Sequence, residues 1–253
     1  MRFSRQPRNE IETLDSLSMR DFFATVRKSL PDAQRQPLVL LVGGNDARHS
    51  AIRRAQSFLR FDLRSSYWSH AAVVLDWKSD ALDQVTGVEV ALHPTRGQIH
   101  DPERAGITEF CLADYADDAV FPNLCIGAIG DLASEGIEPA PSSWRDDVVA
   151  AARDPQSTRG HHDLYAWLAD WVRYAMIPAT AQNPLQANVP MPCAALVDHA
   201  FTSGGLDLIP AATAPNAAPE HLWATFKHWS GHLSQRWGKL RVWRRVKEPR
   251  AMS

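Results

Sequence analysis

A cysteine at the start of a predicted helix is the residue whose position best suits covalent chemistry. Cys193 follows Pro192 and opens the segment PCAALVDHAFTSGG (192–205), which is apolar and ends at two glycines. A proline in the first turn and a glycine stop are typical of a helix. First-turn N–H groups lack intrahelical partners and the helix dipole is positive there, which favours a thiolate. The alternative is a small buried hydrophobic residue, which is the interpretation for Cys111 and Cys125 in strand-like runs.

Two polar residues interrupt predicted strands earlier in the chain. His70 lies in WSHAAVVLDW (68–77), which is β-branched at its centre, and Glu89 lies in TGVEVAL (86–92) with apolar neighbours on both sides. A buried carboxylate needs a partner because an unpaired buried charge is costly. An imidazole on an adjacent strand would be such a partner, and the carboxylate would fix its tautomer. The alternative is that His70 has a structural role and only forms a hydrogen bond with a backbone group.

A thiolate at a helix start, an imidazole and an acid form the nucleophile, base and orienting group of a cysteine hydrolase. In this interpretation Cys193 attacks a carbonyl and His70 takes and returns the proton. Glu89 holds the imidazole, and the N–H of Cys193 helps to stabilise the oxyanion. Three other side chains are rivals for the orienting role: Asp76, His93 and Asp101.

The elements that must position these residues follow a simple order, with strands first and helices later. Besides the two strands above, strands are predicted at 37–44, 107–113 and 123–129, and a half-buried edge strand in the basic segment 236–250. Helices are predicted at 16–30, 49–61, 141–154, 162–177, 192–205 and 219–233. Clustered strands without βαβ alternation predict an α+β fold, with helices packed on an antiparallel sheet.

Composition excludes several classes of protein. The 253 residues are 45% hydrophobic and 22% charged with a net charge of −2, which excludes wholesale disorder and gives no electrostatic case for a nucleic-acid partner. No run approaches the roughly 18 apolar residues of a membrane span, and the first residues lack a signal-peptide pattern. Three widely spaced cysteines favour a reducing compartment. We therefore expect a cytoplasmic protein, or one exported without an N-terminal signal peptide.

Three motifs in order resemble a known family. WSHAAVVL, then VEVAL, then PCAALVDHAFTSGGLDLIP look like the circularly permuted papain-like cysteine hydrolases. These form the permuted branch of the NlpC/P60 group, with the YiiX-like and lecithin:retinol acyltransferase-like proteins. The resemblance implies a permuted papain-like domain at 37–235, with His70 as base, Glu89 as orienting group and Cys193 as nucleophile. An N-terminal extension with a short helix at 1–36 and a basic strand or tail at 236–253 would flank it.

The sequence departs from the family pattern in two ways. Ala-Ala follows Cys193 in place of the frequent serine, and 123 residues separate His70 from Cys193. The long interval predicts an insertion at 131–160 over the cleft.

The resulting prediction is hydrolysis of an amide, peptide or isopeptide bond, with a peptide or amide substrate that can be part of a protein. The alternatives are an acyltransferase or lipid thioesterase on the same fold, and an inactive binding module. No metal or organic cofactor is implied.

The segment LVGGND (41–46) lacks the glycine and lysine pattern of a nucleotide loop and predicts a simple turn. His228 and His232 are interpreted as surface histidines.

Overall fold

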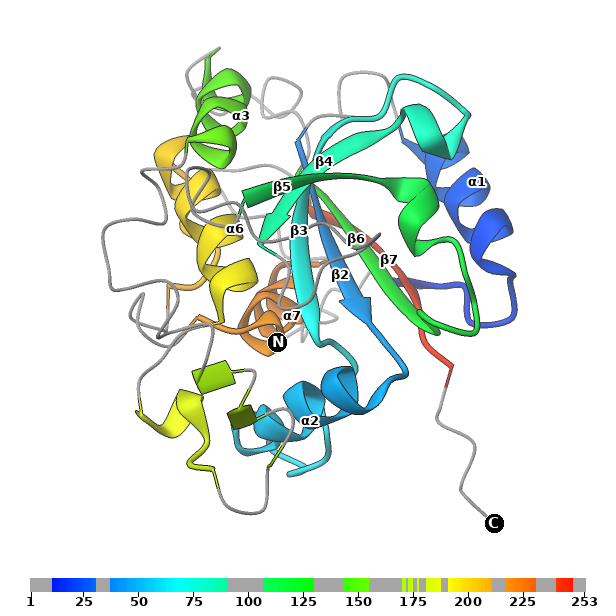
Figure 1. The fold of residues 1–253 in the computed structure, drawn as a ribbon. Coiled ribbons are helices and arrows are strands. Elements are labelled where there is room, and N and C mark those ends of the chain that lie inside the picture. Colours follow the sequence, from blue (N-terminus) through cyan, green and yellow to red (C-terminus); the bar gives the residue numbers. More distant parts are fainter. Residues whose placement is uncertain are drawn as a thin grey trace, which may run out of the picture.

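The chain folds around one mixed sheet. The computed structural model describes residues 11–30, 37–90, 107–129, 143–154, 170–171, 173–174, 177, 181–187, 191–210, 217–230 and 240–247. Within these ranges seven strands form a sheet in the order β1-β7-β6-β2-β3-β4-β5, with helices on both faces (Figure 1). The predicted α+β class is confirmed in this coarse form.

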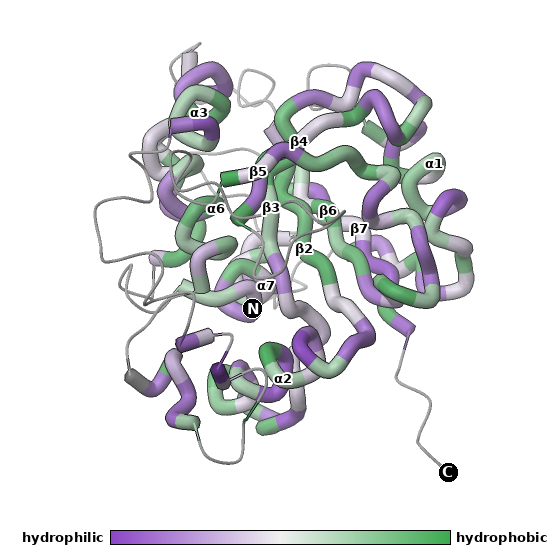
Figure 2. Tube along the Cα trace, viewed as in Figure 1, coloured by the Kyte–Doolittle hydropathy of each residue, from purple (hydrophilic) through white to green (hydrophobic). Residues whose placement is uncertain are grey.

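Three nearly fully buried strands form the centre of the sheet. They are β2 (Leu38–Gly43), β3 (His70–Asp76) and β6 (Asn123–Ile129), and they show as the apolar centre of Figure 2. Both faces of these strands are covered, which is why their sequences are apolar runs with little alternation. β4 (Thr86–Val90) and β5 (Ile107–Cys111) extend the sheet on the β3 side. Every pairing from β7 to β5 is antiparallel.

Side chains of β3 alternate between two cores. Val73 packs in the core that contains α6 (Pro192–Ser203), and its neighbour Val74 packs in the core that contains α1 (Met19–Ser29). This alternation is the period-2 geometry of a strand. The α6 side also holds α3 (Trp144–Arg153) and α7 (Pro219–Trp229). The sheet therefore separates α1 from the helices that follow β6 (Figure 1).

The helix that carries Cys193 has the expected ends. α6 begins with Pro192 in its first turn and is capped at Gly204. Gly204 fits closely against α3, because a Cβ there would lie 2.8 Å from the carbonyl oxygen of Trp144. The predicted helix at 192–205 is thus confirmed to within two residues.

The two ends of the described chain meet at one edge of the sheet. β7 (Leu240–Arg245) lies between β1 and β6, so the prediction of an edge strand in this segment is wrong. β1 (Ile11–Thr13) pairs in parallel with β7, with Ile11 opposite Val242. The sheet is therefore mixed and not purely antiparallel. The N-terminal and C-terminal segments that flank 37–235 both contribute strands to it.

The helix after β2 is shorter than predicted. α2 (Ala47–Ala55) is capped by Asp46, whose side chain accepts from the N–H of His49, and it gives way to a 3-10 turn at Ser57–Leu59. Gln56 marks the change, because its side-chain amide donates to the carbonyl oxygens of Ile52 and Trp68.

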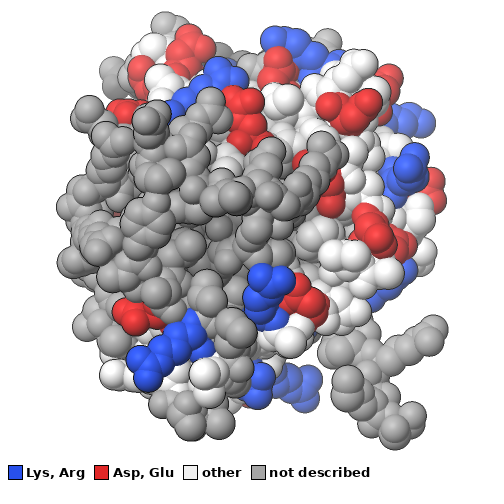
Figure 3. All heavy atoms as spheres, in the orientation of Figure 1, with Lys and Arg blue, Asp and Glu red and all other residues white. Residues whose placement is uncertain are grey.

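Three further observations concern the rest of the molecule. The predicted helix at 162–177 lies for the most part outside the described residues. Among the helices that the structure does describe, none has the length and apolar character needed to cross a bilayer. On the face shown in Figure 3, basic and acidic side chains intermingle, as the net charge of −2 suggests.

Candidate active site

His70 and Glu89 lie on neighbouring strands and contact each other. His70 begins β3, and Glu89 pairs directly with Ala72 of that strand. Alternate residues of a strand share a face, so His70 and Glu89 are diagonal neighbours on one side of the sheet. The Nε2 atom of His70 lies 2.7 Å from Oε2 of Glu89, and both side chains are buried. The sequence-predicted base and orienting acid are therefore brought together.

Cys193 reaches the same imidazole from α6. It is the second residue of that helix, is fully buried, and its thiol lies near enough to the imidazole to help raise the pKa of His70. Because Glu89 engages Nε2, the ring nitrogen left for the thiol is Nδ1. The structure thus places His70 between the predicted nucleophile and the predicted orienting acid.

The start of α6 also supplies backbone donors near the sulfur. Its first helical hydrogen bond runs from the N–H of Ala195 to the carbonyl oxygen of Met191. The N–H groups of Cys193 and Ala194 therefore stand ahead of the helical ladder. Donors in this position can stabilise negative charge that develops on a carbonyl oxygen attacked by the sulfur.

The surroundings of His70 favour its charged form. Burial by itself lowers the pKa of His70, but the charge of Glu89, the neighbouring Cys193 thiol and the hydrogen bond with Glu89 raise it to about 10 from the usual 6.5. This pairing stabilises the folded protein fully below pH 6.5, and the contribution is lost as pH rises through about 10.

Tyr115 is a fourth member of this cluster that the sequence analysis missed. Its hydroxyl donates to Oε2 of Glu89, the same oxygen that faces His70. Its ring stacks beside the imidazole, with centroids 6.4 Å apart and planes 29° apart. Burial and the negative charge of Glu89 raise the pKa of Tyr115 well above its usual value, so the phenol remains a donor. No motif signals this residue, because it lies in a 3-10 turn at Leu112–Tyr115 after β5.

We expect Tyr115→Phe to weaken both the fold and the site. The change leaves a buried carboxylate with one donor fewer, and a hydrogen bond to a charged group contributes about 1.5–3 kcal/mol. Denaturant unfolding should show a loss of that order, while Tyr67→Phe, at a half-buried tyrosine, should cost less. Equal losses in the two variants would mean that the phenol does not support Glu89.

The other two cysteines lie in different surroundings. Cys125 is fully buried in β6, and burial raises the pKa of its thiol well above the usual value. Cys111 is half-buried at the end of β5, and its sulfur donates to Asp114 at 3.3 Å. Of the three cysteines, Cys193 is the one whose thiol contributes to the raised pKa of His70.

The remaining sequence candidates do not join the cluster. Asp76, a rival for the orienting role, lies at the far end of β3 and pairs with Lys78 at 2.7 Å. His93, Asp101 and His232 lie outside the described residues. Within the described ranges no group of three His, Cys, Asp or Glu side chains could hold a metal ion.

The Gly-Gly segment after β2 is a packed turn. A Cβ at Gly43 would lie 1.9 Å from the carbonyl oxygen of Tyr67, and one at Gly44 would lie 2.2 Å from the ring of His49. The N–H of Gly44 donates to the hydroxyl of Ser69, the residue before His70. The two glycines therefore let the backbone approach the start of β3, and this fits the simple turn that the sequence suggests.

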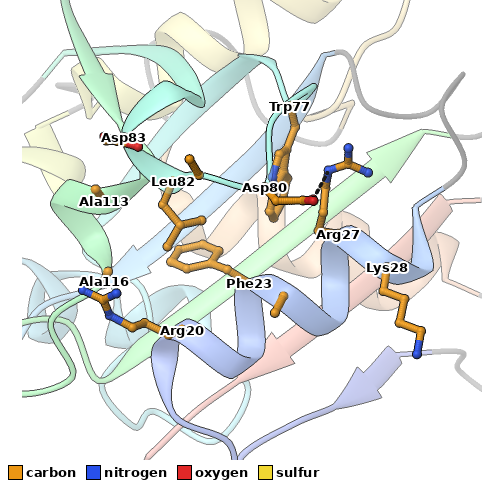
Figure 4. A pocket seen from close by; sticks show the side chains of 12 residues that line it. Arg20, Phe23, Arg27, Lys28, Trp77, Asp80, Leu82, Asp83, Ala113 and Ala116 are labelled. Atoms are coloured by element: carbon orange, nitrogen blue, oxygen red, sulfur yellow. Dashed lines mark ion pairs between the residues drawn. The ribbon is translucent and has the colours of Figure 1, made fainter.

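A hollow of about 900 Å³ lies elsewhere, on the α1 side of the sheet (Figure 4). Phe23 and Trp77 line it together with charged side chains of both signs. Arg27 pairs across it with Asp80 at 3.6 Å, and neither His70 nor Cys193 contributes to its wall. Since its charges are largely balanced and it holds no paired nucleophile and base, the hollow is separate from the candidate active site.

Comparisons with protein-family models, with curated proteins and with solved structures found no match to this chain.

Proposed function

We propose that the protein is a cysteine hydrolase that cleaves amide or peptide bonds on a permuted papain-like fold. The observation that carries the proposal is His70, which contacts Glu89 through Nε2 and lies beside the thiol of Cys193, whose presence helps to raise the pKa of His70. An imidazole that lies between a thiol and an acid is the arrangement of a site for nucleophilic acyl transfer. Resemblance in the motifs around these three residues supports the same interpretation.

Each group has a defined part in the proposed reaction. The Cys193 thiolate attacks the carbonyl carbon, and the N–H groups at the start of α6 stabilise the oxyanion that forms. The C–N bond breaks as the His70 imidazolium gives its proton to the leaving amine, which leaves a thioester on Cys193. The neutral imidazole then takes a proton from water, the hydroxide attacks the thioester, and the thiolate and imidazolium are restored. Glu89 orients the imidazole and stabilises the imidazolium whenever it forms.

Access to this site requires movement. Neither Cys193 nor Glu89 has exposed surface, and His70 is 6% exposed. A substrate carbonyl therefore reaches the sulfur only when surrounding residues move aside, as lids and loops do in many enzymes.

Alkylation by iodoacetamide tests the assignment of the nucleophile. Brief treatment at neutral pH should label Cys193 well ahead of the other two cysteines, because reactivity follows thiolate content. Cys125 is as fully buried as Cys193 and is the matched control, while Cys111 is more exposed. Peptide mass spectrometry measures the three rates. If exposure alone governed labelling, Cys111 would react first, and the proposed activation of Cys193 would be wrong.

A further inference from the structure

An exposed apolar loop projects after α2. Phe58, Phe61 and Leu63 have 42%, 107% and 71% of their surfaces exposed, and they are three of the five large hydrophobic side chains most exposed among the described residues. All three lie within seven consecutive positions, 58–64, which we name the apolar loop. α2 and the turn that follows it stand at the lower edge of the molecule in Figure 1. Scattered single apolar side chains are normal on a surface, but a cluster at a loop tip marks an interaction site.

The base of the apolar loop is held by a charged network. Arg60 donates to Asp62 through Nε and Nη2 at 2.9 and 2.8 Å, and its Nη1 lies 3.5 Å from Glu220 of α7. Glu220 also accepts from the hydroxyl of Ser66 at 2.6 Å. The guanidinium of Arg60 lies over the ring of Tyr67, 5.1 Å from its centroid. These contacts fix both sides of the tip, so Phe61 is held away from the protein core.

Backbone geometry at the tip of the apolar loop also keeps an apolar side chain exposed. Leu63 has a φ of 54°, the single non-glycine residue with positive φ among the described residues. A bulky side chain in this region is rare and costs conformational free energy. With 71% of its surface exposed, Leu63 buries little apolar surface within the protein. Its side chain can therefore contact an apolar surface outside the protein.

Exposed basic residues flank the apolar tip. Arg54 and Arg64 are exposed on either side of it, and neither forms a salt bridge within the described residues. Asp62, two residues before Arg64, is engaged by Arg60. The loop therefore presents apolar side chains between exposed positive charges. This combination matches an anionic lipid surface, where aromatic side chains enter the interface and arginines meet the headgroups.

We propose that the apolar loop docks the protein onto the surface of an anionic lipid bilayer. A protein partner fits less well, because a stable protein interface buries about 800 Å² on each side and a tip of three side chains is much smaller. A bilayer interface accepts a small wedge since its headgroup region deforms around it. The inference stands independently of the proposed hydrolase.

Vesicle sedimentation with the full chain tests this proposal. We expect binding to phosphatidylcholine vesicles that contain about one third phosphatidylglycerol, and about tenfold weaker binding to pure phosphatidylcholine. The double variant Phe61→Ser, Leu63→Asn should lower the partition coefficient at least about tenfold. Asparagine tolerates positive φ, so the fold should be kept. Circular dichroism and thermal unfolding check this.

Two charge variants form a matched pair. Arg64→Gln should weaken binding to the anionic vesicles several-fold, whereas Arg20→Gln, at an exposed arginine of α1, should leave it unchanged.

The proposal is overturned if wild type does not bind the anionic vesicles, or if the double variant binds as well as wild type. It is also overturned if analytical ultracentrifugation shows a dimer that the double variant abolishes, because the loop would then be an interface between copies.

Discussion

Cys193→Ala should abolish turnover. With the sulfur gone no thioester can form, and removal of a nucleophile from a catalytic unit costs on the order of 10⁶ in kcat. The measurement is hydrolysis of p-nitrophenyl acetate, a small activated ester that a reactive thiolate attacks whatever the natural substrate is. Wild type should also show a burst of nitrophenol as the acetyl-enzyme accumulates, and mass spectrometry should find the acetyl group on Cys193.

The other cysteines are the controls for this result. Cys125→Ala removes an equally buried thiol, and Cys111→Ala removes a half-buried one. Both should keep turnover near the wild-type rate once folding is checked by circular dichroism. Full turnover in Cys193→Ala would rule out the proposed nucleophile, and loss of turnover in Cys111→Ala would move the assignment to that residue.

Glu89→Gln should lower turnover by on the order of 10²–10⁴, with little change in substrate binding. Glutamine keeps the shape of the side chain but removes the charge that stabilises the His70 imidazolium at 2.7 Å. Asp76→Asn is the matched control, because it neutralises a carboxylate on the adjacent strand that pairs with Lys78 and not with His70. It should leave kcat unchanged, and ester hydrolysis by the two variants can be compared directly.

The pH dependence separates an electrostatic role of Glu89 from a purely structural one. The charge of Glu89 is a main cause that raises the pKa of His70 to about 10. Its removal should lower that pKa, so the alkaline limb of kcat/KM, where the imidazolium is lost, should move to lower pH. An alkaline limb that stays in place while the rate falls would show that Glu89 only supports the fold. A Glu89 variant as active as wild type would remove it from the site.

Local sequence determined the elements that carry the candidate site. Pro192 and the glycine pair after Ser203 bound the Cys193 helix through backbone effects that act within a few residues, so α6 could be predicted closely. The apolar run around His70 could only be a buried strand for a similar reason. The cost of burying an unpaired charge predicts a partner for Glu89, and an imidazole on the adjacent strand is such a partner.

Tertiary structure decided what depends on register and on residues distant in the chain. The pairing of Glu89 with Ala72 sets the diagonal contact with His70, and a shift by one residue would turn Glu89 to the other face of the sheet. Tyr115 joins the site because the turn after β5 brings its hydroxyl to Glu89, a contact across 26 positions that no local pattern encodes. The parallel pairing of β1 with β7 likewise joins the two ends of the described chain. Local propensities act over a few residues, whereas long-range packing selects among the partners that they leave open.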